Sequence, residues 1–117
     1  MNYSEVLLQE DHNALIAIKL LENAKKVSQS AEIYSLLGYS YFSIADYNNA
    51  IKSYIFLSNL VPSKFEFKLR LMESYRANND LNNAKIIANK ILSMPIKIPS
   101  EAVDLIKQQA KTILLIN

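Results

Sequence analysis

The sequence predicts an all-α fold in which antiparallel helix pairs stack one beside the next and a final helix caps the stack. Apolar residues recur at the three- and four-residue spacing of a helix almost throughout the 117 residues. Only one glycine and three prolines interrupt that spacing, and no stretch shows the apolar–polar alternation of a half-buried strand. The length favours a single domain with one hydrophobic core.

Seven segments carry the helical spacing. They span residues 3–9, 12–27, 31–44, 47–60, 64–78, 81–93 and 100–115. Within 31–44 the apolar positions fall at i, i+3, i+4 and i+7, and they are Tyr34, Leu37, Gly38 and Tyr41. The beginning of the chain is open to two interpretations, because residues 3–27 form either two helices or one bent helix.

Residues that cap helix N-termini precede four of these segments. Asp46 and Asp80 each offer a carboxylate to the free amides of the following turn. Ser63 and Glu66 match the S-x-x-E capping box, which predicts that they start the next helix together. Ser100 follows a proline and is expected to cap the terminal helix.

The chain contains an internal repeat, since a shift of 34 residues places like residues on like residues. The pairs are Leu37 with Leu71, Tyr41 with Tyr75, Asp46 with Asp80, Asn48 and Asn49 with Asn82 and Asn83, Ala50 with Ala84, and Leu57 with Ile91. A period of this length that contains two helices predicts a stacked repeat array, in which neighbouring units share one core.

The first unit resembles the tetratricopeptide repeat (TPR), with tyrosine in place of the motif's tryptophan and phenylalanine. The motif residues are Tyr34, Leu37, Gly38, Tyr41, Ala50, Tyr54 and Pro62. The second copy is degenerate, because Lys68, Met72 and Ala88 stand where the motif has its leading aromatic, its glycine and its phenylalanine. The resemblance implies a short right-handed superhelix with a half-repeat at about 3–28, a repeat at 31–64, a degenerate repeat at 65–98 and a capping helix at 100–115.

The single glycine needs a physical reason, because glycine inside a helix costs about 1 kcal/mol relative to alanine. Two antiparallel helices approach closely only where side chains are small. We expect Gly38 on one helix and Ala50 on the next to supply that gap, with neighbouring Tyr34, Leu37 and Tyr41 filling the space around it. In the terminal helix the expected buried stripe is Val103, Ile106, Ala110 and Ile113, whereas Asp104, Lys107 and Lys111 are expected to face water.

Several function classes are disfavoured by composition. The net charge of +2 comes from scattered residues without a run of one sign, so nucleic acid is not an expected partner. The chain has no cysteine, no glycine-rich phosphate loop, no secretory signal and no apolar stretch of membrane-spanning length. The only histidine, His12, is expected to be a surface or capping residue. We therefore predict a cytoplasmic protein that is not an enzyme and has no catalytic, cofactor or metal site.

The predicted binding surface is the inner wall of the array, formed by the faces of the first helices that are not used for packing. Its residues are Ser35, Tyr39, Phe42, Ser43, Leu69, Glu73 and Arg76. Two interpretations of Tyr39 and Phe42 stay open. Either a neighbouring helix such as 12–27 covers them, or they line an aromatic groove that accepts an apolar partner segment, with Glu73 and Arg76 at its polar end.

The resemblance also sets out the functional alternatives. TPR proteins that clamp chaperone C-termini use a lysine and asparagines at inner positions, where this chain has Ser35, Tyr39 and Ser43, so that clamp is not expected. Among short TPR proteins the chain is most similar to type III secretion chaperones, which predicts an adaptor that holds one partner protein. The alternative is a structural subunit or fragment of a larger transport or ciliary scaffold. Fewer than three full repeats also predicts support from dimerisation or a bound partner.

Overall fold

The computed structural model describes residues 3–117, with side chains from His12 onward. Over this range the chain forms six helices and no strand, which confirms the predicted all-α class. The helices are α1 (Tyr3–Val27), α2 (Ala31–Ser43), α3 (Tyr47–Leu60), α4 (Phe65–Ala77), α5 (Leu81–Ser93) and α6 (Glu101–Leu114).

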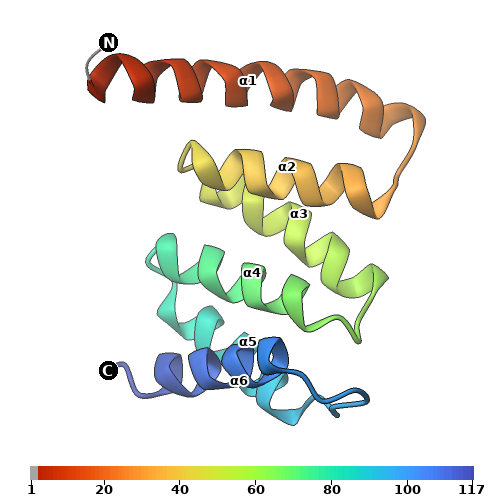
Figure 1. The fold of residues 1–117 in the computed structure, drawn as a ribbon, viewed down its shortest axis with the longest axis vertical. Helices are drawn as coiled ribbons and strands as arrows, with labels where there is room; N and C mark the ends of the chain where they lie inside the picture. Colours follow the sequence, from red (N-terminus) through yellow and green to blue (C-terminus); the bar gives the residue numbers. More distant parts are fainter. Residues whose placement is uncertain (1–2) are drawn as a thin grey trace.

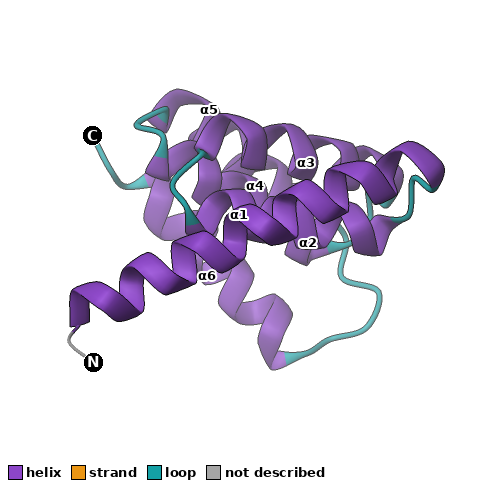
Figure 2. Ribbon diagram, turned by 90° about the horizontal axis from the view of Figure 1, so that it is seen from above, coloured by secondary structure: helices purple, strands orange, loops and turns teal. Residues whose placement is uncertain are grey.

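The helices stack in chain order. Each helix packs against the next one along the chain, and α4 also contacts α6. Figure 1 shows the described N-terminal residues at one end of the long axis and the C-terminus at the other. Seen from above in Figure 2, α3 and α5 lie on one side of the stack, and α2 and α6 lie on the other. The stack therefore has two distinct faces.

The open question at the beginning of the chain is decided in favour of one helix. Residues 3–27 form the single 25-residue helix α1 rather than two. It packs across α2, and its N-terminal part extends beyond the end of α2 (Figure 1).

Three of the predicted N-caps are confirmed. Asp46 and Asp80 accept hydrogen bonds from the backbone amides three residues later, at 3.4 and 3.1 Å. Ser100 accepts one from the Val103 amide at 3.1 Å. The residues before the two aspartates, Ala45 and Asn79, both adopt left-handed backbone conformations with φ of 62° and 61°. The two tight turns thus repeat each other in geometry as well as in sequence.

The predicted capping box at Ser63 and Glu66 is wrong. Helix α4 begins at Phe65, so its N-cap is Lys64, which makes no side-chain capping bond. Ser63 lies one position too early to reach the free amides of the first turn. The Lys64 ammonium instead lies 4.7 Å from the centre of the Phe67 ring, a favourable cation–π distance.

The core lies between the helices of each pair and between neighbouring pairs. Among its buried residues are the repeat-related alanines Ala50 and Ala84, both without exposed surface. Tyr34 contributes by stacking on Phe56 of α3, with ring centres 3.9 Å apart. Tyr41 reaches back to α1, where its hydroxyl donates to Glu22 Oε1 at 2.7 Å. The motif tyrosines of the first repeat therefore tie α2 to both of its neighbours.

The nearest neighbour of Gly38 is the Tyr54 ring, which the prediction did not include. A Cβ atom at Gly38 would lie only 2.7 Å from Cζ of Tyr54 and 2.9 Å from its Cε1. The ring of Tyr54, one turn beyond Ala50 on α3, therefore occupies the space that the glycine leaves. The close approach at Gly38 is therefore between the helix backbone and an aromatic ring, and Ala50 is buried in the core cluster.

Helix α6 buries Ala110 and Ile113 as predicted, while Val103 and Ile106 are half-buried. The prediction that Lys107 faces water is wrong. Its Nζ donates to three backbone carbonyls at the end of α5, those of Ile91, Leu92 and Met94, at 3.2, 3.1 and 2.9 Å. The last carbonyls of a helix lack partners within it, so Lys107 satisfies acceptors that would otherwise need water.

Candidate partner-binding groove

The two aromatic residues of the predicted groove have different environments. Tyr39 is 71% exposed, so neither α1 nor another described helix covers it. Phe42 is half-buried, packs against the core and meets the Tyr47 ring edge-on with centres 5.2 Å apart. Tyr39 is thus available to a partner, whereas Phe42 mainly supports the junction of α2 and α3.

An exposed leucine accompanies Tyr39. Leu36 lies three residues before it on α2 and is 48% exposed, so the two side chains form an exposed apolar pair on that helix. The sequence interpretation missed Leu36. The available signal was an apolar residue outside the core stripe, but such a residue can equally well be covered by another helix.

The predicted serines are placed differently from each other. Ser35 is half-buried and lines a pocket of about 320 Å³ between α2 and α4, together with Leu36, Glu66 and Phe67. Ser43 is exposed, and its hydroxyl donates to the Ser40 carbonyl of its own helix at 2.8 Å. Only Ser35 faces a concave part of the surface.

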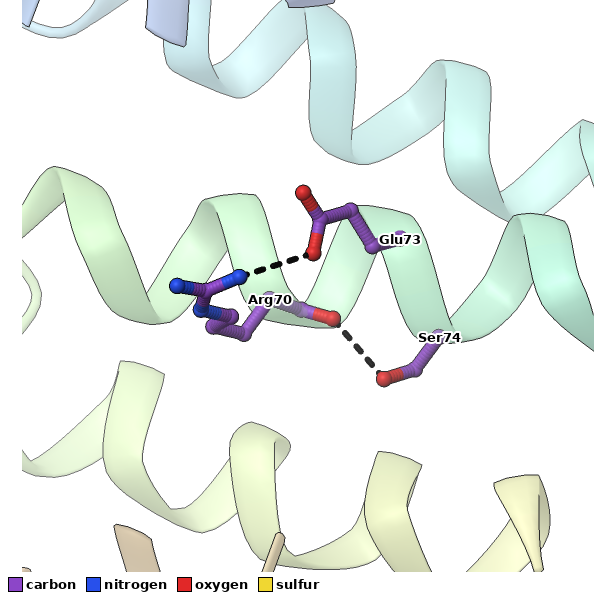
Figure 3. A network of polar contacts seen from close by, with 3 residues as sticks. All are labelled: Arg70, Glu73 and Ser74. Atoms are coloured by element: carbon purple, nitrogen blue, oxygen red, sulfur yellow. Dashed lines mark hydrogen bonds and ion pairs between the residues drawn. The ribbon is translucent and has the colours of Figure 1, made fainter. Parts of the chain in front are cut away.

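The α4 residues of the predicted binding surface also differ in their exposure to solvent. Leu69 is 8% exposed and belongs to the core, so it offers little surface to a partner. Glu73 forms an ion pair with Arg70 at 3.2 Å, and the Ser74 hydroxyl donates to the Arg70 carbonyl at 2.8 Å (Figure 3). Arg76 is exposed. Arg70 was not predicted, although its three-residue spacing from Glu73 on one helix was a signal that the sequence contained.

A second pocket joins α4 to α6. It has a volume of about 330 Å³ and includes Glu73 and Arg76 with Gln108, Gln109 and Thr112 around buried Met72 and Ile113. The contribution of α6 was not predicted, since sequence spacing does not say that α6 returns to contact α4.

Tyr54 lies between the α2 and α4 surfaces. Burial raises the pKa of its hydroxyl, and the charges of Arg70 and Glu73 act on it as well. The ring that fills the space at Gly38 therefore extends toward the charged pair on α4. We refer to Leu36, Tyr39, the two pockets and the Arg70–Glu73 pair together as the groove.

The comparisons with known proteins concern the fold. No protein-family model and no curated protein matches the sequence. Among solved structures, PcrH from Pseudomonas aeruginosa is similar, with a TM-score of 0.67 over 97% of this chain and 92% of that chain, at 16% sequence identity. The fold is that of a TPR-like protein. At this identity the likeness shows the architecture, and the partner-binding role of the groove residues stays a prediction.

Within the described residues, no three acidic or histidine side chains come together as potential metal ligands. His12 is exposed on α1. None of the helices within residues 3–117 is both long enough and apolar enough to span a membrane.

Proposed function

We propose that the protein is a chaperone or adaptor that holds a segment of a partner protein along the groove, without catalysing a reaction. The observation that carries the proposal is the exposed apolar pair of Leu36 and Tyr39 on α2, of which Leu36 also lines the α2–α4 pocket. Exposed aromatic side chains on a rigid helical surface provide contact area at a low cost in conformational entropy.

The charges of the groove favour a partner segment that is mainly apolar with polar ends. Glu73 and Arg70 largely neutralise each other, and Arg76 lines the α4–α6 pocket together with Glu73 and the uncharged amides of α6. An apolar side chain near Tyr39 and an acidic or amide group near Arg76 would match this distribution.

The finer proposal is a type III secretion chaperone of the cytoplasm. PcrH is a TPR-like chaperone of that class, and its similarity covers almost the whole of both chains. Few repeats, an apolar element in the groove and the lack of a carboxylate clamp at Ser35, Tyr39 and Ser43 agree with this assignment.

The test begins with identification of the partner, by affinity capture from the native host and mass spectrometry. The binding constant is then measured by calorimetry with the purified partner. The Leu36→Ala/Tyr39→Ala variant is expected to bind at least tenfold more weakly with an unchanged unfolding temperature, because both side chains are exposed.

Ile86→Ala is the matched control, since Ile86 is an apolar residue with 52% exposure on α5, on the other side of the stack. Its affinity should equal that of the wild type. Equal affinities for all three proteins, or an equal loss in both variants, would contradict the proposed groove.

A further inference from the structure

A third pocket lies between α3, α4 and α5, and no residue of α2 or α6 contributes to it. Its volume is about 350 Å³, near the lower limit of small-molecule sites. Ile55, Leu71 and Ile87 supply an apolar part of its lining, and Lys68 and Lys90 supply two ammonium groups. The pocket is therefore both apolar and basic.

Lys68 is half-buried with only neutral acceptors. Its Nζ donates to Ser58 Oγ at 3.0 Å and to the Pro62 carbonyl at 2.9 Å. Burial lowers the pKa of Lys68, and repulsion from the Lys90 ammonium lowers it further. Two positive charges thus share one pocket, and one of them is partly removed from water.

The surrounding helices do not supply a compensating carboxylate. The only charged residues of α3 and α5 are Lys52, Lys85 and Lys90. The two glutamates of α4 are directed to the groove, where Glu66 lines the α2–α4 pocket and Glu73 pairs with Arg70.

Asp80 is an acidic group close to one residue of the pocket. Its charge contributes to the raised pKa of Tyr75, which also lines this third pocket. Both oxygens of Asp80 accept hydrogen bonds from Asn83, so this carboxylate caps α5.

Lys107 shows what a lysine with a purely structural role looks like in the same protein. Its Nζ donates to three backbone carbonyls at the end of α5 and lies 5.3 Å from the centre of the Phe65 ring. Lys68 has two neutral acceptors and a second ammonium nearby. A bound anion would supply the interaction that Lys68 and Lys90 lack.

We propose that this pocket binds a carboxylate attached to an apolar group, as in the side-chain or terminal carboxylate of an apolar peptide segment. The ammonium groups of Lys68 and Lys90 hold the carboxylate, and Ile55, Leu71 and Ile87 contact the apolar group. This site is separate from the groove. It would therefore give a partner protein bound in the groove a second point of contact.

The probe is N-acetyl-leucine, which combines a carboxylate with an apolar side chain. Binding is followed at constant ionic strength by the backbone amide NMR signals of the ¹⁵N-labelled protein. We expect saturable shifts at residues 58–59, 68 and 90. The neutral N-acetyl-leucinamide should give no saturable shift there, and inorganic phosphate should bind more weakly because it lacks the apolar group.

Lys90→Gln is the main variant, since this exposed residue can change without loss of packing. It should weaken N-acetyl-leucine binding about tenfold, as expected for loss of one charged hydrogen bond. Lys68→Met should weaken it at least as much, with folding verified by the unfolding temperature. Lys52→Gln, a change of the same charge on α3 outside the pocket, should bind like the wild type.

Several outcomes would overturn the proposal. Absence of saturable shifts would mean that Lys68 serves only to bond Ser58 and the Pro62 carbonyl, and that the pocket holds no carboxylate. Equal weakening in Lys52→Gln would mean diffuse attraction rather than a site. Binding of phosphate as tight as that of N-acetyl-leucine, or binding of the amide, would remove the proposed ligand class.

Discussion

The two helix pairs α2–α3 and α4–α5 are built on the same geometry with different side chains. In the first pair Gly38 leaves space that the Tyr54 ring fills. The 34-residue shift places Met72 and Ala88 at the corresponding positions, and both are buried, at 1% and 0% exposure. In the first pair the small residue is on the first helix and the large residue is on the second. In the second pair the sizes are exchanged, because the first helix carries the large Met72 and the second helix carries the small Ala88. We infer that the repeat preserves filled volume between its helices rather than the residue at either position.

The largest expected change in the free energy of unfolding comes from removing the Tyr54 ring between α2 and α3. Tyr54→Ala should lower the free energy of unfolding by about 3–5 kcal/mol, because it leaves a cavity beside a glycine that cannot fill it. Urea denaturation of the purified protein measures this change. A loss below about 1 kcal/mol would show that the helices close the gap.

The same site allows the volume exchange itself to be tested. Gly38→Met alone should cost about 1–3 kcal/mol, because even a Cβ at this position meets the Tyr54 ring. The double variant Gly38→Met/Tyr54→Ala copies the arrangement of the second pair. We expect it to be more stable than the sum of the single effects by about 1–3 kcal/mol in a double-mutant cycle. Additive losses would contradict the exchange.

A lysine from a later helix donates hydrogen bonds near the end of α3 and another does so at the end of α5. Replacing the two lysines should change the free energy of unfolding by different amounts. Lys107→Met should lower the free energy of unfolding by about 1–3 kcal/mol, because three carbonyls lose a charged donor. Lys68→Met should cost less than about 1 kcal/mol, since it also removes a desolvated charge and its repulsion from Lys90. Denaturant unfolding of both variants in parallel makes the comparison, and a larger loss for Lys68→Met would reverse it.

Tyr41 and Tyr75 are repeat-related, but only Tyr41 bonds to a preceding helix. Tyr41→Phe should cost about 1 kcal/mol at neutral pH, through loss of the bond to Glu22. The matched control Tyr75→Phe should cost less, because no such bond is made by Tyr75 within the described side chains. Thermal unfolding at fixed pH compares the two variants.

The stability of the protein at alkaline pH should also depend on the Tyr41–Glu22 contact. Burial, followed by the bond to Glu22, raises the pKa of Tyr41 from 10.0 to about 12. The unfolded chain therefore loses this proton first, and stability should fall as pH rises from about 10 to about 12. Tyr41→Phe should reduce this alkaline loss without abolishing it, since the pKa values of Tyr54 and Tyr75 are also raised. An unchanged alkaline profile would contradict the assignment.

Acidification should weaken the Tyr41–Glu22 contact through protonation of Glu22. The pKa of Glu22 is lowered below 4.5, mainly by its bond to Lys25. The stability that this carboxylate contributes should be present above that value and lost as pH falls through the lower folded-state pKa.

The smallest expected effect concerns the two turns. Ala45 and Asn79 both have positive φ, which asparagine tolerates better than alanine. Ala45→Gly should therefore raise the free energy of unfolding by about 0.5–1 kcal/mol, and Asn79→Gly should change it less. Thermal unfolding of the two variants compares the turns, and an equal gain in both would show that the asparagine is strained as well.

The sequence was sufficient to predict the helices, because their apolar spacing and caps are local properties. The expected segments from 31 onward agree with α2 to α6 to within one residue at each end. At the start of α4, however, the matching S-x-x-E pattern lies one residue out of register with the helix that forms, so the predicted cap is not made. Such a register depends on packing, which local motifs do not contain.

The groove was less predictable than the helices. Exposure of Tyr39, burial of Leu69 and the edge-on contact of Phe42 with Tyr47 depend on which helix lies beside which. Helical periodicity identifies the residues that share a face. It does not say whether the neighbouring helix is close enough to cover that face.

The sequence by itself determined the all-α class, the 34-residue unit and the two aspartate-capped turns, because each depends on residues close together in the chain. Tertiary structure alone decided that α1 is one helix, that Tyr54 is the partner of Gly38 and that Lys107 closes the end of α5. It also brought Lys68 and Lys90 into one pocket. These features join side chains from different helices, and their positions follow from how those helices pack rather than from the sequence around each residue.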